Sequence, residues 1–370
     1  MSNKIIKIEN TQLSTSKHYL RHLESLLPHL NYTFNNDSMY EEFFNEAFYL
    51  INSKHIQHNS DNYIYIIENS YTYLKDKDFK YVANSNKDYK KAIKLFTTII
   101  VKYPSCKYAY YFRGIANAKL FSQWESDYSL ADHYMPAISD YSKTIEIDPS
   151  DFDVYTNRAD SYRDWADWHQ DMLYYKLAIS DYSKAIEINP KSSYAYYYRG
   201  CVKMVIANYE GAIEDYSKVI EINPNFPDAY YNRGNVKEKL KDYEGAIVDF
   251  SMVIEINPQF LDVYYCRGNA KGELKDYKGV IEDYSKAIEI NSNPHSYAYY
   301  QRGYAKFVSE DYEGAIGDFD QAIALSQDYA EAYYWRAQTK IKLGNVNEAK
   351  TDQSIYNDLI RHNDNPELQF

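Results

Sequence analysis

The apolar and polar positions of this chain follow a pattern that returns at a fixed interval. The segment at 229–258, AYYNRGNVKEKLKDYEGAIVDFSMVIEINP, has an upstream copy, AYYYRGCVKMVIANYEGAIEDYSKVIEINP. The closing prolines Pro190, Pro224 and Pro258 are spaced 34 residues apart. Further copies start near Ala109, Val154, Val263, Ala298 and Ala332, and a weaker one ends at Pro104. A fixed period of this length predicts repeated units that stack and bury one continuous core.

This pattern resembles the tetratricopeptide repeat (TPR) family, whose unit of 34 residues is a pair of antiparallel helices. Over the chain the resemblance covers residues 73–363, and in one copy it is carried by Tyr230, Gly234, Tyr243, Ala246, Phe250 and Pro258. The small Gly234 and Ala246 would let the two helices cross closely. Pro258 would end the second helix, because proline disfavours helix in the residue before it. Arg233 departs from the leucine that the family often carries there. We predict an all-α fold, a superhelical α–α solenoid of antiparallel helix pairs.

The domain organisation follows from where the period holds and where it breaks. We expect a helical N-terminal cap at 1–60, a TPR solenoid of about eight units at 61–363 with a degenerate first unit, and a C-terminal tail at 364–370. From Pro104 to Pro149 the spacing is 45 residues, and from Pro149 to Pro190 it is 41. The excesses of 11 and 7 residues are close to three and two helical turns. We therefore predict extended helices in the second and third units.

Composition and charge narrow the classes of function. Gly 12 and Pro 10 leave few chain breakers in 370 residues, which favours helices. The net charge of −12 repels phosphate backbones, so nucleic acid is a poor partner. No window approaches the length of a membrane span, and we predict no membrane insertion. The three cysteines lack a CxxC pair and are odd in number, which fits a reduced, cytoplasmic setting.

Two columns of charged residues recur through the strong copies. The first holds arginine at Arg113, Arg158, Arg199, Arg233, Arg267, Arg302 and Arg336, and the second holds aspartate at Asp140, Asp181, Asp215, Asp249, Asp283, Asp318 and Asp352. The degenerate first copy lacks both. One interpretation is an arginine ladder for anionic ligands. We favour the other, an Arg–Asp ion pair in every repeat, because partly buried arginines are normally paired.

A second stripe on the same helix carries tyrosines. Tyr231 shares a helical face with Asn235 and Glu238, at i+4 and i+7. In the family this face lines a concave groove that holds peptides or partner helices, and tyrosine gives large contact area at low entropy cost. Packing between repeats is the alternative role. The candidate partner-binding residues are Tyr111, Tyr197, Tyr231, Asn235, Tyr265, Asn269, Tyr300, Tyr304 and Tyr334. Tyrosine stands where the lysine of a chaperone-tail clamp would be expected, which argues against that ligand.

Trp124, Trp165 and Trp168 form a possible second patch in the extended units, with packing between helices as the alternative. The His and Asp residues near them lack a recognised metal-ligand spacing, so we expect no metal and no cofactor. His18 and His22 are four residues apart, but the catalytic glutamate of a zinc-protease helix is missing between them. P-loop, GxGxxG and GxSxG motifs are also missing, and we expect no enzyme.

The function expected from this resemblance is a non-enzymatic scaffold or adaptor. Its concave groove would bind an extended peptide or a helix of a partner protein. The alternative is a peptide-sensing receptor or regulator with a ligand groove of the same kind.

Overall fold

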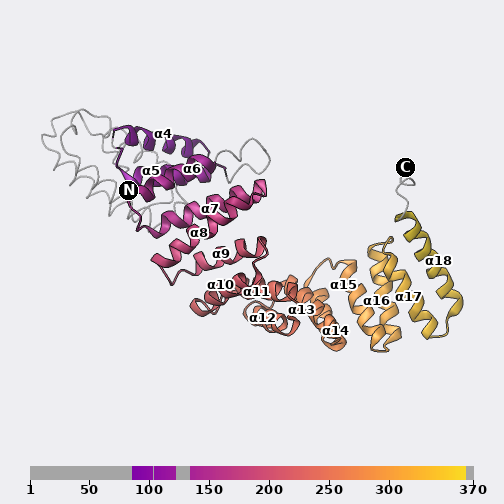
Figure 1. Cartoon of the computed structure of the whole chain (residues 1–370). Helices are drawn as coiled ribbons and strands as arrows, with labels where there is room; N and C mark the ends of the chain where they lie inside the picture. Colours follow the sequence, from indigo (N-terminus) through magenta and orange to yellow (C-terminus); the bar gives the residue numbers. More distant parts are fainter. Residues whose placement is uncertain (1–85, 103, 122–133, 364–370) are drawn as a thin grey trace, which may run out of the picture. The chain divides into compact units, whose positions relative to one another are not determined.

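The computed structural model describes residues 86–102, 104–121 and 134–363. All regular elements in these ranges are α-helices, with no strand among them, which confirms the predicted all-α solenoid of helix pairs. The chain divides into two compact parts, Met1–Ile188 and Asn189–Phe370. Within each part, consecutive helices pack against one another in chain order (Figure 1). The expected cap at 1–60 and tail at 364–370 lie outside the described residues.

The helices of the first part are α4 (Asn86–Lys102), α5 (Lys107–Phe121), α6 (Tyr134–Ile147), α7 (Phe152–His169) and α8 (Met172–Ile188). The helices of the second part are α9 (Ser193–Val205), α10 (Tyr209–Ile222), α11 (Pro227–Lys239), α12 (Tyr243–Ile256), α13 (Leu261–Glu273), α14 (Tyr277–Ile290), α15 (Ser296–Val308), α16 (Tyr312–Leu325), α17 (Ala330–Lys342) and α18 (Val346–Asn363). From α5 onward, odd-numbered helices are the first helix of a repeat and even-numbered ones are the second.

The turn between the two helices of a repeat has the same construction along the second part. After α11, Lys241 adopts the left-handed conformation with a φ of 63°. Asp242 then caps α12, because its side chain accepts a hydrogen bond from the Gly245 amide at 3.0 Å. Capping of this kind satisfies one of the free amides at a helix start. Asn208, Asp276 and Asp311 cap their helices in the same way.

The crossing of the two helices depends on a glycine in the first helix. A Cβ atom on Gly234 would lie 2.6 Å from the ring of Phe250 on α12. Gly200 and Gly268 face Tyr216 and Tyr284 in the same way, at 2.9 Å. The ring of the second helix therefore packs directly against the backbone of the first, which confirms the role predicted for the small residue.

The α7–α8 pair is longer than the pairs of the second part. Its helices have 18 and 17 residues, whereas α11 and α12 have 13 and 14. The additional residues of this repeat lie within its helices, and Gln170 in the left-handed conformation ends α7. In the preceding repeat, the segment that holds most of the additional residues, 122–133, lies outside the described ones.

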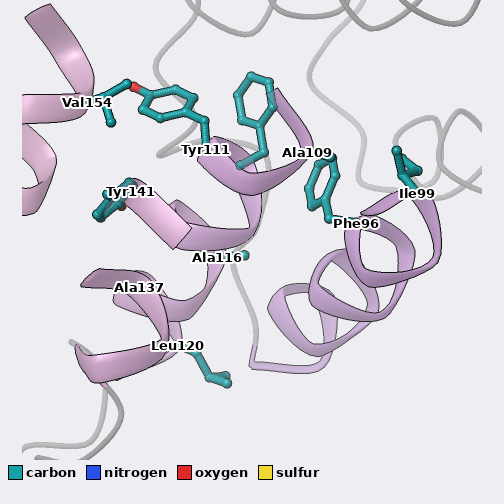
Figure 2. Packing of buried hydrophobic residues seen from close by; sticks show 10 residues of the cluster. Phe96, Ile99, Ala109, Tyr111, Ala116, Leu120, Ala137, Tyr141 and Val154 are labelled. Atoms are coloured by element: carbon teal, nitrogen blue, oxygen red, sulfur yellow. The ribbon is translucent and has the colours of Figure 1, made fainter. Parts of the chain in front are cut away.

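One core cluster of the first part is formed by side chains from four helices (Figure 2). Phe96 on α4 stacks on Phe112 of α5 with ring centroids 5.7 Å apart. Tyr111 of α5 and Tyr141 of α6 lie 6.1 Å apart in the same cluster, which also includes Val154 of α7. Burial of these rings supplies the hydrophobic stabilisation that a single helix pair lacks.

Candidate functional site

The arginine and aspartate columns meet in every strong repeat. Arg233 on α11 donates from Nε and Nη2 to Asp249 on α12, at 2.9 and 2.6 Å. The Asp249 side chain is fully buried. The same two-bond contact joins Arg113–Asp140, Arg158–Asp181, Arg199–Asp215, Arg267–Asp283, Arg302–Asp318 and Arg336–Asp352. The ion-pair interpretation is confirmed, and the arginines hold repeats together.

Each ion pair has further partners that the sequence reasoning missed. Lys237, one turn after Arg233, lies 2.8 Å from Oδ2 of Asp249, the oxygen that also accepts from the arginine Nε. Arg233 also donates from Nη1 to Ser217 on the second helix of the preceding repeat, at 2.9 Å. The arginine therefore links two consecutive repeats. The lysine column is visible in the sequence, because a lysine recurs four residues after the arginine. Its members are Lys203, Lys237, Lys271, Lys306 and Lys340.

Two repeats have no lysine at this position, and the electrostatics of their aspartates differ. Asn117 replaces the lysine near Asp140, and burial raises the pKa of that carboxyl although Arg113 lowers it. Burial likewise raises the pKa of Asp181, whose ion-pair partner is Arg158. At Asp352, burial opposes ionisation, but Arg336 and Lys340 together lower the pKa below its usual value. The second cation therefore offsets the desolvation of the buried carboxylate.

The tyrosine stripe lies at the junction between consecutive repeats. Tyr197, Tyr231 and Tyr300 are half-buried. Each ring packs against an aromatic residue that precedes the first helix of the next repeat, at centroid distances of 5.0–5.2 Å; the pairs are Tyr197–Phe226, Tyr231–Phe260 and Tyr300–Tyr329. Burial raises the pKa of Tyr231 to about 12. These tyrosines therefore pack between repeats and offer only part of each ring to solvent.

Tyr111 and Tyr334 occupy the ends of the same stripe. Tyr111 is 8% exposed, so it lies in the core and offers a partner very little area. Its hydroxyl accepts a hydrogen bond from Asn157 at 3.0 Å, as the hydroxyl of Tyr197 does from Asn232. Tyr334 packs against Tyr356 of α18 with ring centroids 5.2 Å apart.

Tyr265 is the exception in the stripe. The residue that precedes α15 is His295, which is exposed, whereas an aromatic residue precedes α11, α13 and α17. The buried Tyr265 hydroxyl has no hydrogen-bond partner among the described residues. A buried hydroxyl without a partner costs free energy of folding.

The two candidate asparagines contact tyrosines of the fold. Asn235 hydrogen-bonds to the hydroxyl of Tyr231 and so lowers its pKa, against the larger effect of burial. The Asn269 carbonyl oxygen accepts from the hydroxyls of Tyr284 at 2.6 Å and Tyr297 at 3.0 Å. Asn269 therefore connects α13 to α14 and α15.

Tyr304 belongs to an aromatic cluster that the sequence reasoning did not assemble. The ring centroid of Trp335 on α17 lies 4.8 Å from that of Tyr304 and 5.1 Å from that of Phe307, both on α15. All three side chains are partly exposed. Sequence periodicity within α15 pairs Tyr304 with Phe307, but it carries no information about the ring that α17 adds.

The possible second patch lies at the turn between α7 and α8. Trp165 stacks on His169 with ring centroids 4.0 Å apart, whereas the Trp168 side chain is 48% exposed. Met172 and Leu173 beside it are 50% and 59% exposed. Trp124 lies outside the described residues. Among the side chains that the structure describes, no group of His, Cys, Asp and Glu could hold a metal ion.

Short antiparallel helix pairs that pack in chain order define a helical-repeat protein. Four family models match the chain, one described as TPR repeat at residues 208–241 and three as Tetratricopeptide repeat at 227–260, 261–294 and 300–349. Residues 208–349 are therefore repeats of the tetratricopeptide repeat family. Proteins of this family are typically non-enzymatic scaffolds that bind proteins or peptides.

A solved structure shows the same fold. The chain is similar to the C-terminal part of a TPR repeat-containing protein from Cytophaga hutchinsonii, at 20% identity and a TM-score of 0.55 over 67% of this chain and 94% of that one. It also matches YrrB, described as a TPR protein with an unusual peptide-binding site, at 23% identity and a TM-score of 0.46 over 52% and 95% of the two chains. A search of curated proteins gives no significant match. No described helix is long and apolar enough to cross a membrane.

Proposed function

We propose that this protein is a non-enzymatic scaffold that binds a segment of a partner protein along the first helices of its repeats. We call the surface formed by α11, α13, α15 and α17 the first-helix face. Neighbouring first helices are in contact, α11 with α13 and α15 with α17. We take this face to be the groove expected from the family resemblance.

One observation carries the proposal. Aromatic side chains from two consecutive repeats gather on this face and stay partly exposed, namely Tyr304, Phe307 and Trp335. Large aromatic side chains that remain accessible are typical of partner-binding surfaces. Of the residues expected from the sequence, Tyr231, Tyr265, Tyr300 and Tyr334 would contribute the accessible edges of their rings, with Asn235 and Asn269 beside them.

The experiment is a capture from the source cells with the full chain as bait. Tyr304→Ala removes a partly exposed ring from the first-helix face, and Trp168→Ala removes an exposed ring from the α7–α8 turn. We expect the Tyr304→Ala bait to lose a stoichiometric protein that the Trp168→Ala bait retains. The opposite result would place binding on the α7–α8 turn. Recovery of a short peptide in place of a protein would favour a peptide-sensing receptor.

We further infer a reducing, cytoplasmic setting. Cys106, Cys201 and Cys266 are odd in number and form no CxxC pair. A chain with few cysteines and no disulfide framework is typical of reducing compartments. Cell fractionation tests this inference, and recovery of the protein in an oxidising compartment would contradict it.

A further inference from the structure

The first-helix face has two zones of different chemistry. The acidic zone consists of Asp228 and Glu238 on α11 and of Asp262 and Glu273 on α13. The apolar zone consists of Tyr297, Tyr304, Phe307 and Val308 on α15 and of Trp335 and Ile341 on α17. The Tyr297 hydroxyl donates to Asn269 on α13 at 3.0 Å, so the apolar zone begins beside the helix that carries half of the acidic zone.

The carboxylates of the acidic zone lie outside the ion pairs formed by the described residues. None of the four forms an ion pair with a described residue, whereas every aspartate of the buried column does. Lys237 and Lys271 lie on the same two helices, but they contact Asp249 and Asp283 at 2.8 and 2.9 Å. The lysines of α11 and α13 that could neutralise this zone are therefore used inside the repeats, and Lys239 alone remains beside Glu238.

The acidic side chains lie close enough to one another to interact. Burial raises the pKa of Glu238, and the negative charge of Glu273 on the next repeat raises it further, although Lys239 opposes both effects. Like charges held together in this way favour the approach of a cation. Asp262 lies near Tyr231 and Cys266, whose pKa values its charge also raises. The carboxylates therefore share one surface with the tyrosine stripe.

The apolar zone offers the contact area that a charged zone lacks. Tyr297, Val308 and Ile341 are 41%, 36% and 49% exposed. They lie on the same two helices as the ring cluster of Tyr304, Phe307 and Trp335. Large apolar side chains exposed next to one another mark a surface for a partner. Lys306 and Lys340 on these helices are held by Asp318 and Asp352, whereas Lys342, next to Ile341 in the sequence, is exposed.

We propose that the first-helix face binds a protein segment in which lysine or arginine side chains stand beside large apolar side chains. The basic half contacts Glu238 and Glu273, and the apolar half packs against Trp335 and its neighbours. The assignment rests on the proposed function and adds the chemistry of the partner. Charge complementarity selects this occupant, because an acidic segment would add to the repulsion already present between α11 and α13.

The first experiment selects ligands without assuming the natural partner. A phage-displayed library of random peptides, each about 12 residues long, is panned against the full chain at about 0.15 M salt, where the Debye length still exceeds a contact distance. We expect enrichment of Lys or Arg together with Trp, Phe or Leu. Enrichment of acidic peptides, or of apolar peptides without basic residues, would overturn the charge assignment.

The second experiment locates the bound peptides with paired variants. The double variant Glu238→Gln with Glu273→Gln removes both charges, and Glu244→Gln with Glu282→Gln removes two exposed charges from the second helices. The first pair should weaken selected peptides about fivefold and reduce the dependence of binding on salt. The second pair should leave the affinity unchanged. Equal effects of the two pairs would contradict the inference.

A third variant separates this inference from the proposed function. Val308→Ser with Ile341→Ser alters two exposed positions of the apolar zone, and the unfolding transition checks that the chain remains folded. If these changes weaken peptides that the Glu→Gln pair does not affect, the face binds partners but has no preference for basic segments. If neither variant affects binding, or the library yields no ligand, both the inference and the proposed function are wrong.

Discussion

The ring of Tyr231 on α11 lies with its centroid 5.1 Å from that of Phe260, the residue that precedes α13. Because this contact crosses from one repeat to the next, Tyr231 contributes to the stacking of repeats. We expect Tyr231→Ala to lower the free energy of unfolding by about 2 kcal/mol, below the range for fully buried rings since the side chain is half-buried. Urea unfolding measures this loss of free energy, and Tyr231→Phe is the control that keeps the ring. An unchanged free energy would contradict the packing role.

Arg233 should matter for stability through two repeats at once. Arg233→Ala removes one of two cations from the fully buried Asp249 and also the hydrogen bond to Ser217. We expect a loss of about 3 kcal/mol, because breaking a buried pair leaves a poorly compensated charge. Ser217→Ala, which removes only the contact to the preceding repeat, should cost less than about 1 kcal/mol. Equal losses for the two variants in urea unfolding would show that the carboxylate is not the main cause.

Asp140, one of the two aspartates without a lysine partner, gives a prediction for pH. Burial raises the pKa of Asp140, so its ionisation costs folding free energy above that pKa, and the cost disappears as the pH falls through it. Asn117→Lys would supply the second cation that Lys340 gives to Asp352. We expect the free energy of unfolding of the variant to exceed that of the unchanged protein by about 1 kcal/mol at pH 7. Near pH 3 the two values should be equal. Asn117→Met is the uncharged control. A gain that is equal at both pH values would contradict the electrostatic explanation.

Tyr265 and Tyr197 form a matched pair, because only one of the two hydroxyls has a partner. Tyr265→Phe removes a buried hydroxyl without a hydrogen bond and should leave the protein equally stable or up to about 1 kcal/mol more stable. Tyr197→Phe removes the acceptor of the Asn232 side chain and should cost about 1 kcal/mol. Thermal unfolding of both variants measures the difference. A loss of stability in Tyr265→Phe would mean that its hydroxyl has a partner after all.

Much of this fold could be predicted because the period of the sequence sets the register of every repeat. The pairing of Arg233 with Asp249 follows from their joint occurrence, and the close approach at Gly234 follows from its position opposite Phe250. The lysine that contacts the same carboxylate recurs just as regularly in the sequence. Its role cannot be predicted there, because it depends on the burial of the aspartate.

The role of the tyrosines could not be predicted from the same pattern. Helical spacing shows that Tyr231 shares a stripe with Asn235, but whether a ring covers that stripe depends on Phe260, in the next repeat. Trp335 raises the same difficulty, because its contacts with Tyr304 and Phe307 join two repeats. Periodicity within one helix does not encode such contacts, and they decide which aromatic side chains remain accessible.

The claim that the first-helix face binds the partner is tested most directly by hydrogen–deuterium exchange of the full chain with and without the captured partner. We predict slower exchange over Pro227–Lys239, Leu261–Glu273 and Ser296–Val308, since binding there stabilises the amides of the first helices. The second helices Tyr243–Ile256 and Tyr277–Ile290 should change little. Protection confined to the second helices, or to the turn between α7 and α8, would contradict the account.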